Sequence, residues 1–538
     1  MSFNLTGLII NNIALSVNAS FKEAFSVAKK RLRSVGISTE DISFDIFKRS
    51  IDARKKNDIK LVYSVLARGS FGAVDEGRLK AANISLYTKA TPQIEYGQGE
   101  MDGRVVVVGA GPCGLFCSLI LAESGYAPLI LERGGSVTER KKIIDEFKRT
   151  RILDTSTNIQ FGAGGAGTFS DGKLVTRIND SLTNYVLEKF VEFGAPADIL
   201  VSARPHIGTD ILSVVIDRMI DKIVSLGGEI MYHTRFIDYK AGARGVSAVI
   251  TDKGEIACSD LVLAVGHSAR DTYETLIDKG LDIIPKAFSV GMRIEHLAED
   301  IDKAMYGDFA GHPALGHAEY NLSYNTKERG VYTFCMCPGG VVVAATSEEG
   351  GVVTNGMSYH TRSSRNSNCA VLSTVFTSDH GGTSRSGIDF QRRIERLAYL
   401  SGGGDYSAPI MTVGDFLNKN YGTSPSRVIP SYMDGDGVRL ASAEDFLPSF
   451  VTDNIRGGLV QFDRQISGFA SKDAILTGAE TRTSAPVRIL RVNRLGFCQG
   501  IPNLYPSGEG AGYAGGITSA AIDGLKTALS ILKKYRPR

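Results

Sequence analysis

The stretch that decides the fold is Arg104–Gly114, which reads RVVVVGAGPCG. Its run of β-branched valines is typical of a parallel strand buried on both faces. Gly109, Gly111 and Gly114 follow with the spacing GxGxxG. In this pattern the first glycine makes the turn, the second lets the backbone approach a pyrophosphate, and the third lets a helix pack closely on the strand. We therefore expect a strand, a tight turn and a helix whose N-terminus faces phosphate groups.

The residues after this motif complete the pattern. A helix is expected through Leu115–Glu123, and PLILE (128–132) reads as a second strand. Glu132 ends that strand, where a carboxylate can accept hydrogen bonds from a ribose diol. Two further GxGxxG matches, at Gly162–Gly167 and Gly510–Gly515, lack a following strand that ends in an acid. The match at Gly109 alone has the complete context for binding an adenine dinucleotide.

Two other glycine clusters indicate FAD rather than NAD. The loop QFGAGGAGTFSDGK (160–173) could use its backbone N–H groups as an anion-binding nest. The segment NLYPSGEGAGYAGGITSAAIDGLKTA (503–528) supplies a strand, an acid at Glu509 and a helix rich in small residues. A helix N-terminus beside the pyrimidine edge of an isoalloxazine would stabilise an anionic reduced flavin. Close packing of that helix on the sheet is the other interpretation of its small residues, and both can hold.

Several separated motifs carry a family resemblance. The chain resembles the FAD-binding elements of glutathione-reductase-type flavoproteins in three segments, VVVVGAGPCGL (105–115), DLVLAVGHSARDT (260–272) and LYPSGEGAGYAGGI (504–517). More narrowly, the chain resembles the poorly characterised bacterial family of FAD-dependent, or NAD(FAD)-utilising, dehydrogenases. The motifs that carry this second resemblance are KRSIDARKK (48–56), GAGGAGTFSDGKL (162–174), FCMCPGG (334–340) and GAETRTSAPVRILR (478–491).

The resemblance implies tightly held, non-covalent FAD and assigns its contacts by position. Glu132 would meet the adenosine ribose, and backbone near Arg235 and Phe236, at the end of a strand over GGEIMYHTRF, would meet the adenine. Gly508 and Glu509 stand where the superfamily often has Gly-Asp on the ribityl chain, so the longer glutamate is a departure. The full set of implied cofactor contacts is Gly109, Gly111, Pro112, Gly114, Glu132, Arg133, Gly164, Gly165, Ala166, Gly167, Thr168, Ser170, Asp171, Lys173, Phe236, Ala264, Gly266, Gly508, Glu509, Gly516 and Ile517.

The order of the elements predicts an α/β chain of three domains. Residues 1–98 read β-α-β-β-α-β, with a capping box at Ser20 and Glu23, which suggests a ferredoxin-like α+β domain. Residues 99–285 and 489–538 would form the two parts of a Rossmann-like FAD-binding domain. The irregular, β-rich residues 286–488 would be an inserted α+β cap that faces the substrate, because strand, loop and helix return after them.

Composition narrows the function classes. The chain has 538 residues, 43% hydrophobic and 22% charged, with a net charge of +3. That charge is too small for the whole protein to indicate a nucleic-acid or membrane partner. Seven cysteines, an odd number, fit a reducing compartment. No basic segment precedes the first apolar run, and no stretch of ~20 apolar residues occurs. We expect a cytoplasmic protein without a membrane span.

Few residues indicate catalysis, because hydride transfer to a flavin needs little acid or base from the protein. His267 follows the strand DLVLAVG, at the end where ligands gather in open α/β sheets. It could donate a proton or hold an anionic substrate, and an orienting role toward the cofactor or a structural role is the simpler interpretation. Arg293 and His296 could face the far side of the flavin. Cys335 and Cys337 are spaced CxC rather than CxxC, which disfavours a thioredoxin-like dithiol. No metal-binding spacing is visible.

The first functional hypothesis is an FAD-dependent oxidoreductase that transfers a hydride between bound flavin and a small organic substrate, with NAD(P)H as the candidate transient donor. One alternative is a flavoprotein that binds or modifies RNA through its N-terminal domain, where KKRLR (29–33) and ARKK (53–56) concentrate positive charge. A solvated helix face and a charged turn are the simpler interpretation of those residues. The other alternative is a flavin-binding scaffold without catalysis.

The motifs also predict how a nicotinamide would react. Because the sequence encodes no complete second nucleotide site, a nicotinamide would dock transiently in the cleft beneath the insertion. Such docking makes few fixed contacts, so we expect weak binding and poor discrimination between NADH and NADPH. Stopped-flow reduction of the bound flavin by each nucleotide measures both properties. Tight, selective saturation by one nucleotide would contradict this prediction, and no bleaching by either would indicate a different donor.

Overall fold

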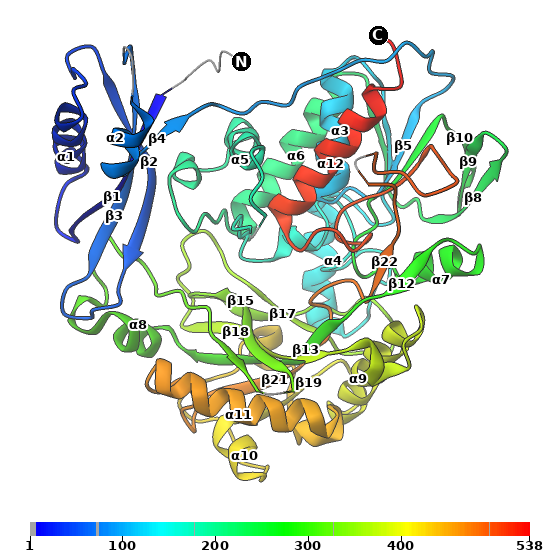
Figure 1. Ribbon diagram of the computed structural model, residues 1–538. Coiled ribbons are helices and arrows are strands. Elements are labelled where there is room, and N and C mark those ends of the chain that lie inside the picture. The colour runs from blue at the N-terminus through cyan, green and yellow to red at the C-terminus, as the bar shows by residue number, and fades with distance from the viewer. Residues whose placement is uncertain (1–6, 72–74, 177, 327, 494) are drawn as a thin grey trace.

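A computed structural model describes residues 7–71, 75–176, 178–326, 328–493 and 495–538. Three bodies are visible in Figure 1: a small sheet unit at the N-terminus, a layered α/β body that contains the C-terminus, and a β-rich body below both. Among the described residues, no helix combines the length and the apolar character that crossing a membrane requires.

The sheet built on RVVVV has five parallel strands in the order β23-β11-β5-β6-β7. All four valines of β5 are buried, as a central parallel strand requires. The five strands are β5 (Val105–Val108), β6 (Leu129–Leu131), β7 (Glu229–Met231), β11 (Asp260–Leu263) and β23 (Leu504–Pro506). Residues far apart in the chain therefore pair directly, because β23 follows β11 by more than two hundred residues but lies beside it.

Helices and a small sheet cover the two faces of this parallel sheet. On one face α3 (Pro112–Glu123) and α12 (Ile517–Leu532) lie side by side, with α5 (Thr183–Glu192) and α6 (Thr209–Ser225) beyond them (Figure 1). On the other face Val106 and Val108 pack against a three-stranded antiparallel sheet. That sheet consists of β8 (Phe236–Gly242), β9 (Gly245–Thr251) and β10 (Gly254–Ala257). The outer helices are α4 (Val137–Thr150) and α7 (Arg270–Asp278).

One strand boundary differs from the expectation. A single strand over GGEIMYHTRF is wrong, because β7 ends at Met231 and Phe236 begins β8 instead. His233 between them has a φ of +51°. Its N–H donates to the carbonyl of Gly134, and the N–H of Thr234 donates to the carbonyl of Glu132. The backbone turns at these residues because its hydrogen bonds go to the segment after β6 rather than to a continued ladder.

The N-terminal unit has the element order that the sequence predicts. Its strands form an antiparallel sheet in the order β2-β3-β1-β4, and the Ser20–Glu23 capping box is confirmed at the start of α1. The β2 edge joins the unit to the α/β body, since the N–H of Arg49 donates to Val201 and its carbonyl accepts from Ala203. The elements are β1 (Gly7–Ser16), α1 (Phe21–Ser34), β2 (Ser43–Asp52), β3 (Lys60–Arg68), α2 (Glu76–Ala81) and β4 (Ile84–Tyr87).

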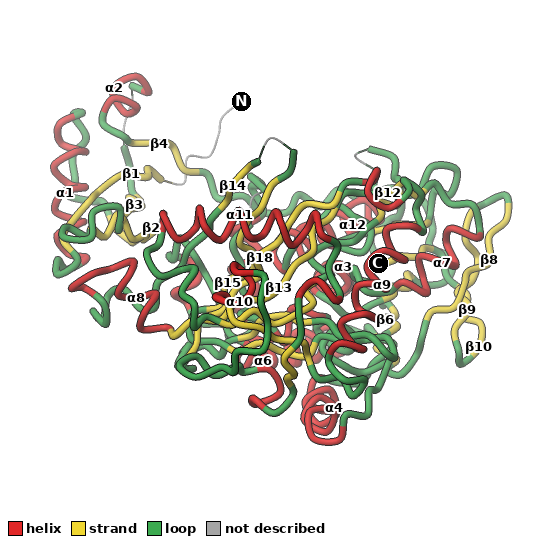
Figure 2. Tube along the Cα trace, turned by 90° about the horizontal axis from the view of Figure 1, so that it is seen from below, coloured by secondary structure: helices red, strands yellow, loops and turns green. Residues whose placement is uncertain are grey.

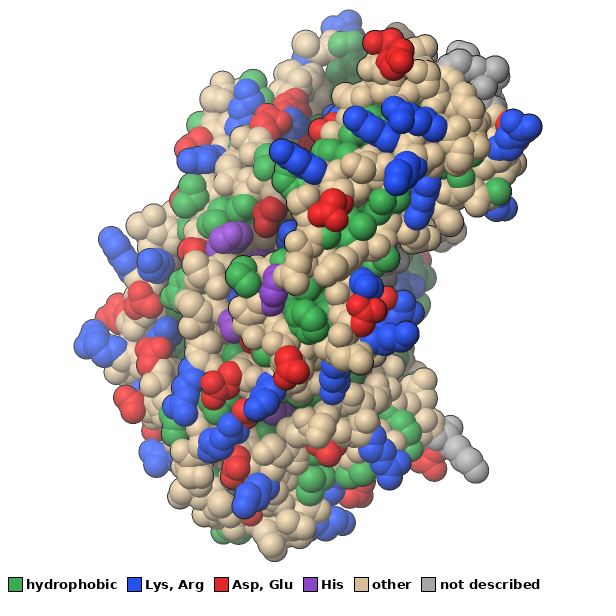
Figure 3. Space-filling model, turned by 90° about the vertical axis from the view of Figure 1, so that its left-hand side faces the viewer, with side chains coloured by type: hydrophobic (Ala, Val, Ile, Leu, Met, Phe, Trp, Pro, Cys, Tyr) green, Lys and Arg blue, Asp and Glu red, His purple; other side chains and the backbone are tan. Residues whose placement is uncertain are grey.

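Part of the positive charge in this unit has a local structural role. Arg31 donates to the carbonyls of Asn11 and Asn12, and Arg33 donates to the hydroxyl of Thr39. On the side of the molecule drawn in Figure 3, positive and negative side chains are mixed over the lower part, while several lysine and arginine side chains lie close together in the upper part. The local contacts of Arg31 and Arg33 agree with the simpler interpretation of KKRLR as part of a helix face.

The β-rich body contains a seven-stranded sheet in the order β14-β15-β18-β13-β21-β19-β20. The chain enters through β12 (Ile283–Pro285) and leaves through β22 (Val487–Ile489), which pair antiparallel. The sheet strands are β13 (Phe288–Leu297), β14 (Ser323–Asn325), β15 (Gly330–Cys337), β18 (Asn366–Val375), β19 (Ala408–Thr412), β20 (Val438–Leu440) and β21 (Ile475–Glu480). A separate hairpin consists of β16 (Val341–Ala344) and β17 (Thr354–Met357).

One face of this sheet is covered by α11 (Ser449–Gln465), which runs across β13, β15 and β18 (Figures 1 and 2). Its buried Val451, Ile455, Leu459 and Phe462 recur at helical spacing, so they form the stripe that packs on the strands. The opposite face is turned toward the α/β body (Figure 1). The remaining helices are α8 (Ala298–Tyr306), α9 (Ser386–Ser401) and α10 (Val413–Asn418).

Packing of α12 on α3 yields a stability prediction. A Cβ added to Gly524 would lie 1.9 Å from the carbonyl oxygen of Cys113, so Gly524→Ala must push the two helices apart. We expect a loss of about 1–3 kcal/mol in the free energy of unfolding, measured by urea denaturation. The matched control is Gly457→Ala in α11, which meets no atom within 4 Å and should gain up to ~1 kcal/mol. Equal stability of Gly524→Ala and the wild type would contradict this packing.

Candidate active site

A cavity of about 300 Å³ lies where the strands of the parallel sheet end. This is the position at which open α/β sheets bind ligands. The α/β body contributes the N-termini of α3 and α12, the loop 160–173 and the residues after β11, while the β-rich body closes the far end. The residues from that closing side are Phe334, Cys335, Asn355, Glu480, Arg482 and Thr483. The wall is therefore shared by segments from most of the chain.

Most of the cofactor contacts implied by the sequence line this cavity. The lining residues among them are Gly109, Gly111, Pro112, Glu132, Arg133, Gly165, Ala166, Gly167, Ser170, Asp171, Lys173, Phe236, Ala264, Gly266, Glu509, Gly516 and Ile517. Gly114, Gly164, Thr168 and Gly508 lie behind the wall instead. Gly114 packs against the carbonyl of Gly109, and Gly508 packs against Cys113. These positions support the wall but do not present a surface to a ligand.

The glycines of the site divide into two kinds. A Cβ at Gly109 would lie 2.4 Å from the carbonyl oxygen of Ala264, and one at Gly114 would lie 1.9 Å from that of Gly109, so both are required by packing. At Gly111 the nearest atom is 3.8 Å away, and at Gly515 nothing lies within 4 Å. Side chains at these two cavity-lining positions would occupy the cavity itself. The absence of a side chain at Gly111 and Gly515 thus leaves the cavity open, whereas at Gly109 and Gly114 it allows the backbone to pack closely.

Glu132 has a larger role than the ribose contact that the sequence implies. Its carboxylate accepts the N–H groups of Ala110 at 2.9 Å, Gly134 at 2.9 Å and Gly162 at 3.0 Å. Two carboxylate oxygens offer about four acceptor positions, so about one remains for a ligand hydroxyl. Glu132 therefore fixes the loops on either side of the cavity as well as lining it.

Buried Arg140, which sequence reasoning missed, shapes the glycine loop. Its guanidinium donates to five backbone carbonyls, among them those of Gly162, Ala163 and Gly165. The N–H groups of Gly162–Gly165 all donate to acceptors in the protein, so this part of the loop has no free donors for the expected anion-binding nest. The loop is held rigidly from behind because a cation satisfies its carbonyls. No local pattern marks Arg140, since its partners lie at least 18 residues away.

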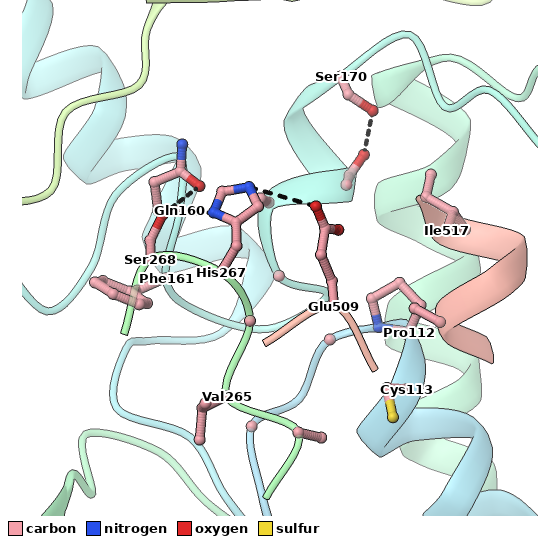
Figure 4. Close-up of a pocket in the computed structure, with 18 of the residues that line it drawn as sticks. Pro112, Cys113, Gln160, Phe161, Ser170, Val265, His267, Ser268, Glu509 and Ile517 are labelled. Atoms are coloured by element: carbon pink, nitrogen blue, oxygen red, sulfur yellow. Dashed lines mark hydrogen bonds and ion pairs between the residues drawn. The ribbon is translucent and has the colours of Figure 1, made fainter. Parts of the chain in front are cut away.

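A chain of polar side chains connects the middle of the cavity wall. Gln160 Nε2 donates to the carbonyl of Ala345, so its Oε1 accepts the hydroxyl of Ser268 at 3.2 Å. Ser268 Oγ then accepts Nδ1–H of His267 at 2.9 Å. This sequence of donors leaves Nε2 of His267 without a proton. In Figure 4 the ring points toward Glu509, with 3.9 Å between Nε2 and Oε1.

The proton of this pair resides on Glu509 rather than on His267. Burial raises the pKa of Glu509 to about 7, although its side chain is 23% exposed to the cavity. Burial, together with the charges of Arg482 and Arg270, lowers the pKa of His267 to about 3. Near neutral pH, Glu509 therefore exchanges a proton within reach of a neutral imidazole nitrogen. The sequence signal for this pair was weak, because the two residues lie 242 positions apart.

The far end of the cavity contains one of the candidate cysteines but not the neighbouring arginine. Cys335 lines the wall. Arg293 is fully buried behind it, paired with Glu480 at 2.7 Å, so the expectation that it faces the cofactor is wrong. His296 is also buried away from the cavity, because its Nε2 lies 2.6 Å from the carbonyl of Phe469. Cys337 is buried as well and does not line the wall.

The three cationic side chains that line the cavity are all ion-paired. Arg133 pairs with Asp271, Lys173 with Asp171, and Arg482 with Glu395. Each pair commits its positive charge to the protein. To a substrate, the described wall therefore presents hydroxyl, amide, thiol and carboxyl groups rather than an unpaired cation. Groups of His, Cys, Asp and Glu that could hold a metal ion are absent from the described residues.

Comparison with known proteins identifies the relatives of this chain. An uncharacterized protein of Clostridium beijerinckii is 45% identical over 536 residues, which cover 98% of each chain. The chain belongs to the family of that clostridial protein. Residues 287–483 match the family described as "FAD-dependent protein, C-terminal domain-like", and residues 8–68 match a domain of unknown function. The first of these matches supports FAD as the cofactor and coincides with the β-rich body.

Solved structures show more distant likenesses. An L-amino acid deaminase from Proteus myxofaciens, in complex with anthranilate, is 13% identical; the match covers 84% of this chain and 95% of that one, with a TM-score of 0.32. Glycine oxidase from Geobacillus kaustophilus is 12% identical over 81% and 96% of the two chains, also at 0.32. CtdE in complex with FAD is 11% identical over 80% and 84%, at 0.31. TM-scores this low carry no argument about the reaction of this chain.

The raised pKa of Glu509 predicts a pH-dependent stability. Its folded-state pKa of about 7 exceeds the ordinary 4.5, so the stabilisation it provides is present below pH 4.5 and is lost as the pH rises through 7. The side chain in Glu509→Gln does not ionise. This variant should therefore not show the loss of about 3 kcal/mol in the free energy of unfolding that the wild type undergoes as the pH rises. Urea unfolding of the ligand-free protein at pH 5 and pH 8 measures this. The free energy of unfolding of Glu509→Gln, relative to that of the wild type, should increase only at the higher pH.

A matched control separates burial of the carboxyl from the loss of a negative charge. Glu349→Gln removes a carboxylate from an exposed position on the β-rich body. If Glu509→Gln and Glu349→Gln change stability equally at both pH values, the buried, protonated state of Glu509 is wrong.

Proposed function

We propose that this protein is an FAD-dependent oxidoreductase that transfers a hydride between flavin and a small organic substrate. One observation carries the proposal: the open glycines, the carboxylate of Glu132, and Glu509 with its neighbour His267 line one continuous cavity. The β-rich body that closes the far end belongs to a family described as FAD-dependent. A dinucleotide site and a place for chemistry are therefore contiguous.

The shape of the wall fits the cofactor. Gly111 and Gly165 lie side by side in the wall, since a Cβ on Gly111 would lie 3.8 Å from Cα of Gly165 and one on Gly165 would lie 3.1 Å from Cα of Gly111. Gly515 and Gly516 leave the start of α12 open. A pyrophosphate needs such close approach to backbone, and a flat ring system needs an unobstructed helix start. Cavity-facing glycines at both places support an extended ligand with a phosphate-bearing middle.

Particular residues would hold each part of FAD. Glu132 would accept a ribose hydroxyl with its remaining acceptor position. Gly111, Pro112 and the loop Gly165–Gly167 would flank the pyrophosphate, next to the N-terminus of α3. The N-terminus of α12, at Gly516 and Ile517, would face the isoalloxazine. When bound, FAD supplies two-electron redox chemistry by accepting or giving a hydride.

The protein's own part in the reaction is to handle the proton. Hydride transfer requires a proton to be taken up or released, and a group with a pKa near the working pH does this best. Glu509 has such a pKa, of about 7. The imidazole of His267, whose Nε2 lies 3.9 Å from Oε1 of Glu509, stays neutral and so leaves the proton on the carboxyl group. His267 is itself held in one tautomer by Ser268.

The paired cations of the wall bear on the substrate. An unpaired arginine or lysine would favour a carboxylate substrate, whereas Arg133, Lys173 and Arg482 are all paired with protein carboxylates. We therefore propose an uncharged substrate, with NAD(P)H as the candidate transient donor of electrons.

Gly111→Val tests the cofactor site. Because nothing lies within 3.8 Å of the added Cβ, the variant should fold but place its side chain in the cavity, and FAD should be lost. Visible absorbance of the purified protein, before and after added FAD, measures binding, and far-ultraviolet circular dichroism measures folding. The control Gly457→Ala, exposed on α11, should keep the flavin spectrum of the wild type. A wild type without flavin bands that added FAD does not restore would refute the proposed function.

A further inference from the structure

Two cysteines at the far end of the cavity have no role in the function proposed so far. Cys335 is partly exposed and lines the wall, whereas the other cysteines are buried. Cys337, two residues later on β15, is buried directly behind it, and its Sγ donates to the carbonyl of Cys335 at 3.4 Å. The side chain of Cys337 is also the largest cause of the lowered pKa of the Cys335 thiol. One thiol thus faces the cavity and the other supports it.

The backbone at this position is specially arranged. Phe334 pairs with Ala370 and Cys337 with Asn368, so three steps along β15 match two along β18. The strand therefore contains a bulge, which re-aims side chains and often lies next to functional sites. Cys335 has a φ of +45°, in the left-handed region that a residue with a side chain rarely adopts. Such strain persists only where the surroundings hold it.

Buried cations hold this arrangement in place. Arg293 donates to the carbonyl of Cys335 at 3.1 Å while paired with Glu480. The charges of Arg293 and Lys173 also contribute to the lowered pKa of the Cys335 thiol. The thiol of Cys337 has a raised pKa, because it donates to Cys335 and is buried. The sulfur of Cys335 is therefore the nucleophile, while the thiol of Cys337 keeps its proton. Thiol–disulfide exchange uses one attacking thiolate and one resolving thiol in this way.

We propose that Cys335 and Cys337 form a redox-active dithiol that reduces small, uncharged disulfides, and that a reduced flavin in the same cavity restores it. The inference rests on the proposed function for its supply of electrons. The CxC spacing disfavours a thioredoxin-like dithiol at a helix start, whereas these cysteines lie on a bulged strand. An uncharged disulfide fits because the cations of the wall are paired with protein carboxylates.

The exchange balances in two steps. The Cys335 thiolate attacks one sulfur of R–S–S–R, which forms a mixed disulfide and releases the first RS⁻. Cys337 then loses its proton, and its sulfur attacks Sγ of Cys335, which releases the second RS⁻ and leaves a Cys335–Cys337 disulfide. Two electrons have passed from the pair to the substrate. Two electrons from a reduced flavin and two protons return the pair to thiols, and Glu509 on the same wall can supply a proton.

The first experiment uses the purified wild-type protein. It is incubated with bis(2-hydroxyethyl) disulfide, its remaining thiols are alkylated, and its peptides are mapped by mass spectrometry. We expect one peptide that holds Cys335 and Cys337 as an internal disulfide, lighter by two hydrogens. The five buried cysteines, which are Cys113, Cys117, Cys258, Cys369 and Cys498, serve as internal controls and should stay alkylatable only after denaturation.

Matched variants separate the roles of the two thiols. Cys337→Ser keeps a hydrogen-bond donor but cannot close the disulfide, so it should trap the mixed disulfide at Cys335. Cys337→Ala lacks the donor, so the pH midpoint of Cys335 alkylation should move upward toward the ~8.5 of a free thiol, while Cys337→Ser stays near the wild type. Cys335→Ser should not react with the disulfide probe. A merely structural pair would not produce this difference between serine and alanine.

Two readouts keep the failures distinguishable. Flavin content is measured by visible absorbance on the same samples, independently of the peptide map. If flavin is bound while Cys337 remains a free thiol after Cys335 has reacted, or if neither reacts, the dithiol is refuted and the proposed function stands. If the disulfide forms in a protein that binds no flavin, the proposed function fails and the source of electrons in this inference fails with it.

Discussion

One buried carboxylate organises the cavity. Glu132 accepts N–H groups from Ala110 in the turn after β5, from Gly134 after β6, and from Gly162 in the long glycine loop. Hydrogen bonds to a charged acceptor are about twice as strong as neutral ones, and a buried carboxylate must find such donors. Arg140 completes the arrangement from behind by binding the carbonyls of the same loop. The open glycines and the start of α3 keep their positions because these two charges fix the backbone around them.

A second set of buried charges fixes the β-rich body against the α/β body. Arg270 on α7 binds Glu395 on α9 at 2.7 Å, and Glu395 also binds Arg482 on the cavity wall at 3.0 Å. Removing one member of a buried set is strongly destabilising, because it leaves a charge without a partner. The network therefore determines the relative orientation of the two bodies, and contributes less to the stability of each body by itself. Burial and, after it, the positive charge of this network lower the pKa of His267 and so keep that imidazole neutral.

Local patterns predicted the elements whose causes are local. The valines of β5, the three glycines and Glu132 all lie within residues 105–132, and the Ser20–Glu23 cap adjoins its helix, so these elements could be predicted from spacing. The roles of Arg140, Gln160 and Arg482 could not be predicted in this way, because their partners are distant in the chain. The turn at His233 was missed for the same reason: hydrogen bonds to Glu132 and Gly134 override a sequence that reads as one strand. Arg293 was expected to face the far side of the flavin because it lies at the start of the insertion, whereas its partner Glu480 lies almost two hundred residues later and could not be identified from the sequence.

The insertion between β12 and β22 has a consequence for how the chain acquires its structure during synthesis. β11 cannot pair with β23 until the ribosome has synthesised about 240 further residues, and α3 cannot pack against α12 until still later. Until then the nascent chain exposes an unpaired edge of the parallel sheet and an apolar face of α3, surfaces that favour association with other chains. Loop-closure entropy makes such late, long-range pairing slow. The β-rich body, whose strands pair within residues 288–480, can form first and shorten the distance that the last strand must close.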